Sequence, residues 1–534
     1  MDLEESDLEN LVIRDKEYYR KRRNKILIII SIVLVIIAIV IVTILLLLKK
    51  RGGKIICIYR TTKENENIKL INADDTISFS LIINNKSFSK NNSHIFEKPG
   101  LHNVTFHFKN KLESLEHLFF YLDNLIEIDF SQLETEKVKS FAYVLNYCRN
   151  LTKVNFDNKT PNLKNMEYMF AEAYEITTLN IKLDTSKVTR MDLMFYYVEK
   201  IKSLDLSNFE FDNLINATSM FEHCYNLKEI KFNENNENIR AYNLQYVFSM
   251  FENCFSLEYL NTQIFKFGKL KDFSRVFQNC HSLKEIDISN LDLSAVNSID
   301  YVFNGCFNLK SINTSNLKIN HFLVNTENAF SNCRKLTSLD LSSFNLSHIK
   351  DASNMFNNCT DLKYVELPNK ILSIHLTNYM FENCYNLTSL NLGFLENAQN
   401  WSFAYGMFKN CKSLKNIKIP NVTTYLLGQV GEMFSGCTDL ETIDFKQLET
   451  KNILNISRMF YHCEKLKHLD LSKFNTKKVR KVTGVLDGVP RNVNIIINES
   501  ITGENFLIEI QKLKEESILS RYYSHPYKLI LDFI

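Results

Sequence analysis

The chain has 534 residues and a formal net charge of +3, and 45% of its residues are hydrophobic. It contains only 6 prolines and 13 glycines, which excludes a disordered or collagen-like stalk. Four positive charges lie in the linker KKRGGK at 49–54, so the remainder beyond it is close to neutral. This balance argues against nucleic acid as the main partner.

The N-terminal end predicts a membrane anchor. Residues 1–25 form a short polar tail that begins acidic and ends basic, and Ile26 to Leu48 is an uncharged run of 23 residues. A run of this length can cross a bilayer as a helix. The basic linker 49–54 follows it where a signal peptide would have small residues at a cleavage site, so we expect an uncleaved transmembrane helix at 26–48.

The flanking charges favour one orientation slightly. Seven basic residues precede the apolar run and six follow it by residue 63. The excess places the N-terminus in the cytoplasm and the rest of the chain at the cell surface, in a single-pass plasma-membrane protein.

Residues 55–110 predict a small β-rich module. The segments IICIYR, TISFSLII and LHNVTFHFK read as strands, and turn-forming residues separate them. We expect this module to cover the first coil of the region that follows.

Eleven of the twelve cysteines fall on one repeating interval. Between Cys254 and Cys463 the interval stays at 25–27 residues, and Leu122, Ala173 and Val198 continue the series toward the N-terminus. The cysteines of this series, here called the cysteine column, are Cys148, Cys224, Cys254, Cys280, Cys306, Cys333, Cys359, Cys384, Cys411, Cys437 and Cys463. Self-similarity at this period is typical of a stacked solenoid, here of about 14 coils.

Each position of this series, whether cysteine or its substitute, is here called the mark of its coil. The residues around the mark predict the structure of one coil. Phe stands three positions before the mark in thirteen of the fourteen copies, with Leu145 as the exception. The copy from Phe330 to Leu346 reads FSNCRKLTSLDLSSFNL. Its L-x-L core alternates with period two and predicts a strand of a parallel sheet on one face. The spacing by three in M-F-x-x-C-x-x-L predicts a short helix or helical turn on the opposite side.

The cysteine column admits two interpretations, a disulfide ladder or metal site and a row of small buried apolar residues. We favour burial, because Leu122, Ala173 and Val198 occupy the same position and cannot bridge or ligate. No C-x-x-C pair provides a local zinc chelate, and we expect no metal and no cofactor. Cys57 lies outside the column, and we expect it to be buried, although a pair between chains is the alternative.

The solenoid is expected to occupy 111–490, with a C-terminal cap at 491–534. The segment VTGVLDGVPRNVNIII lacks the cysteine and interrupts the pattern with Gly and Pro. An apolar-periodic stretch around Phe506 and Ile510 then predicts a helix that covers the last coil.

The repeated M-F-x-x-C-x-x-L-x-x-L-x-L-S-x-F resembles the BspA-type leucine-rich repeat of bacterial and protist surface proteins. One coil carries it in Phe330, Cys333, Leu336, Leu339, Leu341, Ser342 and Phe344, and a later coil reads FYHCEKLKHLDLSKF. The likeness covers residues 119 to about 490. It implies surface-displayed adhesion or host-interaction proteins, with no catalytic activity and no shared binding residue. The N-terminal anchor departs from the family pattern.

No catalytic motif stands out, and we expect no enzymatic activity. The best candidate for binding is the outward position of the L-x-L strand, seven residues after each mark, where twelve of fourteen residues are Asp, Glu or Asn. The candidates are Asp205, Asp287, Asn313, Asp340, Glu366, Asn391, Asp444 and Asp470. This polar ridge is either a solvated face whose side chains bond to neighbouring strands or a recognition surface for a protein or glycan. Neighbouring acids such as Asp340 and Glu366 are a weak candidate cation site.

These features together predict a membrane-anchored leucine-rich-repeat solenoid that serves adhesion or recognition outside the cell. The alternative is an anchored scaffold whose repeats face the cytosol and organise partner proteins.

Fourteen Asn-x-Ser/Thr sequons would accept sugars in a secreted eukaryotic protein. The coil between Cys224 and Cys254 is the longest, and we expect a protruding loop at Asn233–Asn238.

Overall fold

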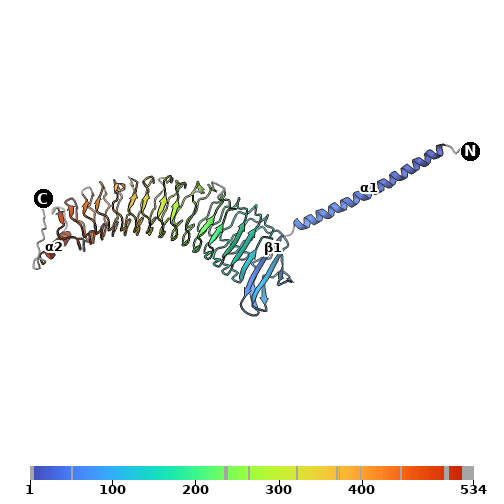
Figure 1. Cartoon of the computed structure of the whole chain (residues 1–534), viewed down its shortest axis with the longest axis horizontal. Coiled ribbons are helices and arrows are strands. Elements are labelled where there is room, and N and C mark those ends of the chain that lie inside the picture. Colours follow the sequence, from blue (N-terminus) through green and yellow to red (C-terminus); the bar gives the residue numbers. More distant parts are fainter. Residues whose placement is uncertain are drawn as a thin grey trace.

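The computed structural model describes residues 5–49, 52–233, 239–262, 265–319, 323–368, 371, 373–396, 398–422, 424–445, 448–497 and 504–519. It is a curved parallel solenoid of about 13 turns, with a β-rich region and one long helix at its N-terminal end (Figure 1). The predicted fold class is therefore confirmed. Most of the loop expected at 233–238 lies outside the described residues.

Helix α1 (Glu5–Lys49) contains the predicted membrane span without a break between tail and span. It is the helix in the described part of the chain that is long and apolar enough to cross a membrane. Its described apolar side chains from Ile26 to Val42 are exposed, so this part of the helix packs against no protein core.

The β-rich region continues the sheet of the solenoid. Its strands are β1 (Gly53–Thr61), β2 (Glu66–Lys69), β3 (Phe79–Ile83), β4 (Lys86–Phe88), β5 (Ser93–Phe96) and β6 (Gly100–Phe108). Strand β1 pairs antiparallel with both β6 and β7 (Leu125–Asp129), in a sheet of order β4-β3-β6-β1-β7-β8-β9. The first coil therefore has no free sheet edge, and the inward-facing Cys57 of β1 is fully buried.

One strand per coil builds the parallel sheet. The strands are β8 (Lys153–Asp157), β9 (Thr178–Lys182), β10 (Ser203–Asp205), β11 (Glu229–Lys231), β14 (Glu285–Asp287), β15 (Ser311–Asn313), β16 (Ser338–Asp340), β17 (Tyr364–Glu366), β18 (Asn416–Lys418), β19 (Thr442–Asp444) and β20 (His468–Leu471). Equivalent repeat positions pair, as in Leu339 with Val365. In the long coil, β12 (Ile239–Ala241) pairs in parallel with β13 (Phe265–Phe267) of the next coil. The short 3-10 helix η1 (Gly393–Leu395) follows the strand position of a later coil.

Of the two alternatives predicted for the opposite wall, a short helix or a helical turn, the helix is wrong, because tight turns form there. In the coil of Phe330, the N–H of Phe330 donates to the carbonyl of Met355 in the next coil at 2.9 Å. The N–H of Cys333 donates back to the carbonyl of Phe330 at 3.2 Å. Backbone donors thus alternate between the next coil and their own turn. Asn328 and Asn332 adopt positive φ of 54° and 62°, which a right-handed helix does not permit.

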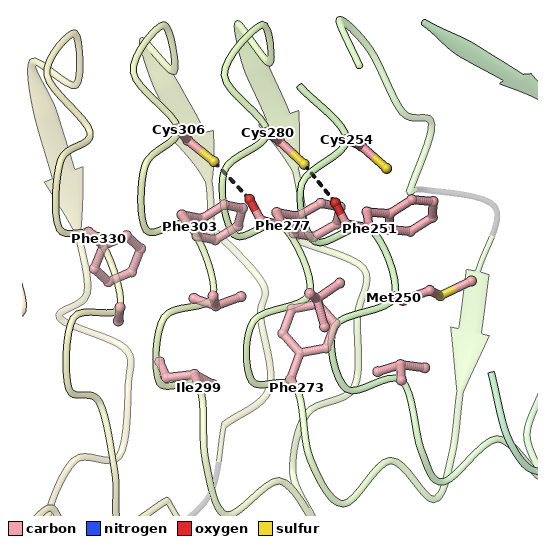
Figure 2. Packing of buried hydrophobic residues seen from close by; sticks show 14 of the residues in the cluster. Met250, Phe251, Cys254, Phe273, Phe277, Cys280, Ile299, Phe303, Cys306 and Phe330 are labelled. Carbon is pink, nitrogen blue, oxygen red and sulfur yellow. Dashed lines mark hydrogen bonds between the residues drawn. The ribbon is translucent and has the colours of Figure 1, made fainter. Parts of the chain in front are cut away.

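The core is built from columns of identical side chains. The rings of Phe251, Phe277 and Phe303 stack nearly parallel, with centroids 5.6 Å and 5.4 Å apart (Figure 2). Beside them, each cysteine of the column is completely buried. All twelve cysteines are free, so the structure agrees with the interpretation of the column as buried thiols.

Each column thiol also makes a hydrogen bond. The S–H of Cys280 donates to the carbonyl of Phe251, and the S–H of Cys306 to that of Phe277, at 3.2 Å and 3.1 Å (Figure 2). The same bond recurs at 3.0–3.2 Å for all eleven column cysteines. Burial raises the pKa of these thiols, to about 12 for Cys148, which keeps the proton on sulfur for donation.

The solenoid extends past the boundary predicted at residue 490. Strand β21 (Asn494–Ile497) pairs in parallel with β20, which gives one further coil. Leu486 and Val489 take the Phe and Cys positions and are buried. Gly484 and Gly488 have φ of 68° and 76° and occupy turn positions that other coils fill with residues at positive φ.

A helix follows the last coil, as the sequence predicts. Helix α2 (Glu504–Leu519) buries Phe506 and Ile510, which are only 2% and 3% exposed. These two side chains join the solenoid core, so the apolar end of the stack is covered.

The columns predict unequal costs for truncation. Phe330→Ala should destabilise the solenoid by about 3–5 kcal/mol, because it removes one ring from the stack and leaves a cavity. Cys333→Ala should cost about 1 kcal/mol, because the Phe303 carbonyl keeps a second donor, the N–H of Cys306. Urea unfolding of the full chain in detergent checks both values, and equal losses would contradict this account of the core.

Candidate binding surface on the parallel sheet

The predicted polar ridge lies on the outer face of the sheet. None of its eight residues is buried. Asp205, Asp287, Asn313, Asp340, Glu366 and Asp444 end their strands, Asp470 lies inside β20, and Asn391 precedes η1 outside a strand. Pairing in register brings three pairs of them side by side in neighbouring coils, namely Asp287 with Asn313, Asp340 with Glu366, and Asp444 with Asp470.

Most of the ridge also holds the backbone turn that follows the strand. The carboxylate of Asp340 accepts the N–H of Ser342 at 2.9 Å, and that of Asp205 accepts both the N–H and the hydroxyl of Ser207. The same turn bond forms at Asp287, Asn313, Asn391 and Asp470. Hydrogen bonds from the following serine lower the pKa of Asp205 and Asp340. The serine side chain has the larger effect and its backbone N–H the smaller one. The Asp or Asn at this position therefore stabilises the turn within its own coil, a role that the sequence did not predict.

Near the N-terminal end, the ridge is hydrogen-bonded from coil to coil. The amide of Asn155 donates to Asp129 at 2.9 Å, and the amide of Asn180 donates to Asn155 at 2.6 Å. These residues line a depression of about 380 Å³ against Ile56 and Ile58 of β1. The depression connects the N-terminal module to the sheet face of the solenoid.

A second row of outward side chains completes the surface, two residues before the ridge on each strand. It includes Tyr259, Glu285, Ser311 and Tyr364, and the two tyrosines are 60% and 49% exposed. Tyr259, Glu285 and Ser311 line a depression of about 480 Å³ together with ridge residues. Sequence reasoning singled out only one of the two outward positions, although the period of two places both on the same face.

A further polar column, which the sequence did not single out, lies one residue before the cysteine column. The side-chain amides of Asn358, Asn383 and Asn410 each donate to the asparagine of the preceding coil, at 3.1, 2.7 and 2.8 Å. The ladder ends at Gly436, where a Cβ would lie 2.2 Å from the Asn410 side-chain oxygen. Because the Asn358 amide is tied into this ladder, its sequon is a poor acceptor for sugar.

The interior offers little space for a ligand. An apolar cavity of about 30 Å³ lies in the long coil, lined by Phe221, Met250, Phe273 and neighbouring apolar side chains. Its volume is that of about one water molecule. Within the described ranges, no group of three or more His, Cys, Asp or Glu side chains is placed to hold a metal ion.

Two known protein families match the sequence of this chain. A family described as "Mycoplasma protein of unknown function, DUF285" matches residues 86–201, 113–232, 176–285 and 378–498, which together cover more than half of the chain. The family described as "BspA type Leucine rich repeat region (6 copies)" matches residues 273–406. The chain belongs to the BspA-like leucine-rich-repeat family, whose fold is typically non-enzymatic. Its repeats indicate a protein-binding surface protein.

Among solved structures, the chain matches the leucine-rich-repeat ectodomain of the Arabidopsis thaliana membrane receptor kinase GASSHO1/SCHENGEN3, determined in complex with CASPARIAN STRIP INTEGRITY FACTOR 2. The two are 13% identical, with a TM-score of 0.19, and the match covers 70% of this chain. The chain spans 50% of the length of that ectodomain. No curated protein matches the chain.

The two outward rows should respond differently to mutation. Asp340→Ala should destabilise the solenoid by about 1 kcal/mol, because it removes the acceptor of the turn. Glu285→Ala should change stability by less than about 0.5 kcal/mol, because this side chain is exposed and in the row without the turn bond. Thermal unfolding of the two variants compares them. If they lost the same stability, the turn-holding role of the ridge would be refuted.

Proposed function

We propose that the protein is anchored by α1, displays the solenoid outside the cell, and recognises protein or glycan partners with the outer face of its parallel sheet. The function is adhesion or recognition. The site comprises the predicted ridge, from Asp205 to Asp470, together with the row that contains Tyr259, Glu285 and Tyr364.

The observation that carries this proposal is the exposed, rigid array on β14–β17. Its strands are fixed by ladder pairing, and its side chains project at the spacing of the coils, about 4.8 Å. Tyr364 begins β17 at one end of this array, and Tyr259 lies outside a strand in the coil before β14, with acids and amides between the two tyrosines. Exposed tyrosines on a rigid scaffold are typical of recognition surfaces, because they bury a large area at a low entropic cost.

The runner-up function is a scaffold with cytosolic repeats. It uses the same sheet face and the same anchor, and differs only in the side of the membrane. The flanking charges favour the external placement by one residue, seven against six. Topology therefore separates the two candidates.

Protease added to intact cells tests the topology. If the solenoid is outside, the repeats should be digested while an epitope tag placed before Met1 survives. Permeabilised cells provide the control, because there both parts are accessible. Full protection of the repeats in intact cells would favour the cytosolic scaffold.

Substitution of the exposed tyrosines tests the sheet face. In cells that display the full chain, Tyr259→Ala with Tyr364→Ala should reduce attachment to a cell monolayer by about threefold or more, because hot-spot tyrosines contribute more than about 1 kcal/mol each. The matched control is Tyr242→Ala, a tyrosine 51% exposed outside the sheet face. Normal attachment of the double variant at equal surface expression would refute this site.

A further inference from the structure

The last coils carry a second surface, at the opposite end of the solenoid from α1 (Figure 1). Residues 473–481 contain five basic residues and no acid. Lys477, Lys478, Arg480 and Lys481 are exposed, and within the described part of the chain none of the four forms an ion pair. Their charge is therefore available to a partner.

Exposed apolar side chains lie in the two coils that precede these cations. Tyr425 and Leu426 are 66% and 52% exposed, and Leu454 is 38% exposed. Side chains of this size usually lie in the core, so a group of three on one surface points to a contact.

Hydrogen bonds between coils show that the apolar and basic residues form one continuous strip. The N–H of Arg480 donates to the carbonyl of Leu454 at 2.8 Å. The side chain of Asn452 donates to the carbonyl of Tyr425 at 2.8 Å, and Lys478 donates to the Asn452 side-chain oxygen at 2.6 Å. The C-terminal strip thus runs from the apolar Tyr425, Leu426 and Leu454 to the basic Lys477, Lys478, Arg480 and Lys481, over neighbouring coils.

We propose that the C-terminal strip binds an acidic segment of a partner protein that carries aliphatic side chains. The carboxylates of the segment pair with the four cations, and its aliphatic side chains pack on Tyr425, Leu426 and Leu454. A nucleic acid or sulfated polysaccharide would use only the basic half. The apolar half and the basic half of the strip follow one another along the solenoid axis. One short segment that carries both aliphatic and acidic side chains can therefore contact both halves. This surface is separate from the sheet face and does not depend on it.

A defined peptide tests the proposal on the full chain in phosphatidylcholine nanodiscs. The probe is a fluorescent 15-residue peptide of glutamate with leucines at helical spacing, and binding is measured by anisotropy. Lys477→Glu with Arg480→Glu should weaken binding at least about tenfold, and Leu426→Ser should also weaken it. The control is Lys310→Glu with Lys363→Glu, two exposed lysines of earlier coils, which should leave binding unchanged.

Three competing ligands complete the experiment. A peptide with serine in place of leucine, phosphatidylserine vesicles and heparin are each compared with the probe. The proposal holds if the leucine peptide binds more tightly than all three. It is overturned if the serine peptide binds equally well, if vesicles or heparin bind more tightly, or if the control variant weakens binding as much as the strip variant.

Discussion

The S–H of each column cysteine joins two coils, because it donates to a carbonyl of the preceding coil. A cysteine is small enough to fit beside the stacked phenylalanine rings, and its thiol supplies a donor where an aliphatic residue supplies none. The bond adds to the backbone hydrogen bonds that join neighbouring coils along the turn wall and the sheet. Ala173 and Val198 fill the same space without the donor, so the bond refines the stack, and the burial of apolar surface sustains it.

The stacking of the coils separates the side chains that hold the solenoid together from those that are free to bind a partner. Residues that recur in many coils serve the stack, as Asp340 and Ser342 do at the turn and the asparagine ladder does beside the cysteine column. Residues that differ from coil to coil are free to serve a partner. Tyr259 and Tyr364 on the sheet, and the basic segment 473–481 near the C-terminal end, belong to this second kind. A solenoid thus gives a uniform scaffold to the two binding surfaces that we propose.

The 26-residue interval and the alternation in L-x-L were sufficient to predict the solenoid, its parallel sheet and the burial of Cys333 and Phe330. Other features were not predictable from spacing alone. A spacing of three apolar residues fits a helix and a run of tight turns equally well, and only the positive φ at Asn328 and Asn332 distinguishes them. The last coil was missed because Leu486 and Val489 replace the marker residues. The sequence predicted the position of the ridge. It did not predict the turn bonds of the ridge, because they depend on the backbone conformation after each strand. The repeat pattern also does not indicate whether a partner would bind the ridge or the C-terminal strip.

Thiol labelling of the native protein tests the account of the column most directly. The full chain in mild detergent is treated with a membrane-permeant maleimide before and after denaturation, and the adducts are counted by mass spectrometry. The structure predicts no adduct at the eleven column cysteines in the native state and adducts at all twelve cysteines after denaturation without reductant. Native labelling of several column cysteines, or disulfides between successive coils that block labelling after denaturation, would contradict it.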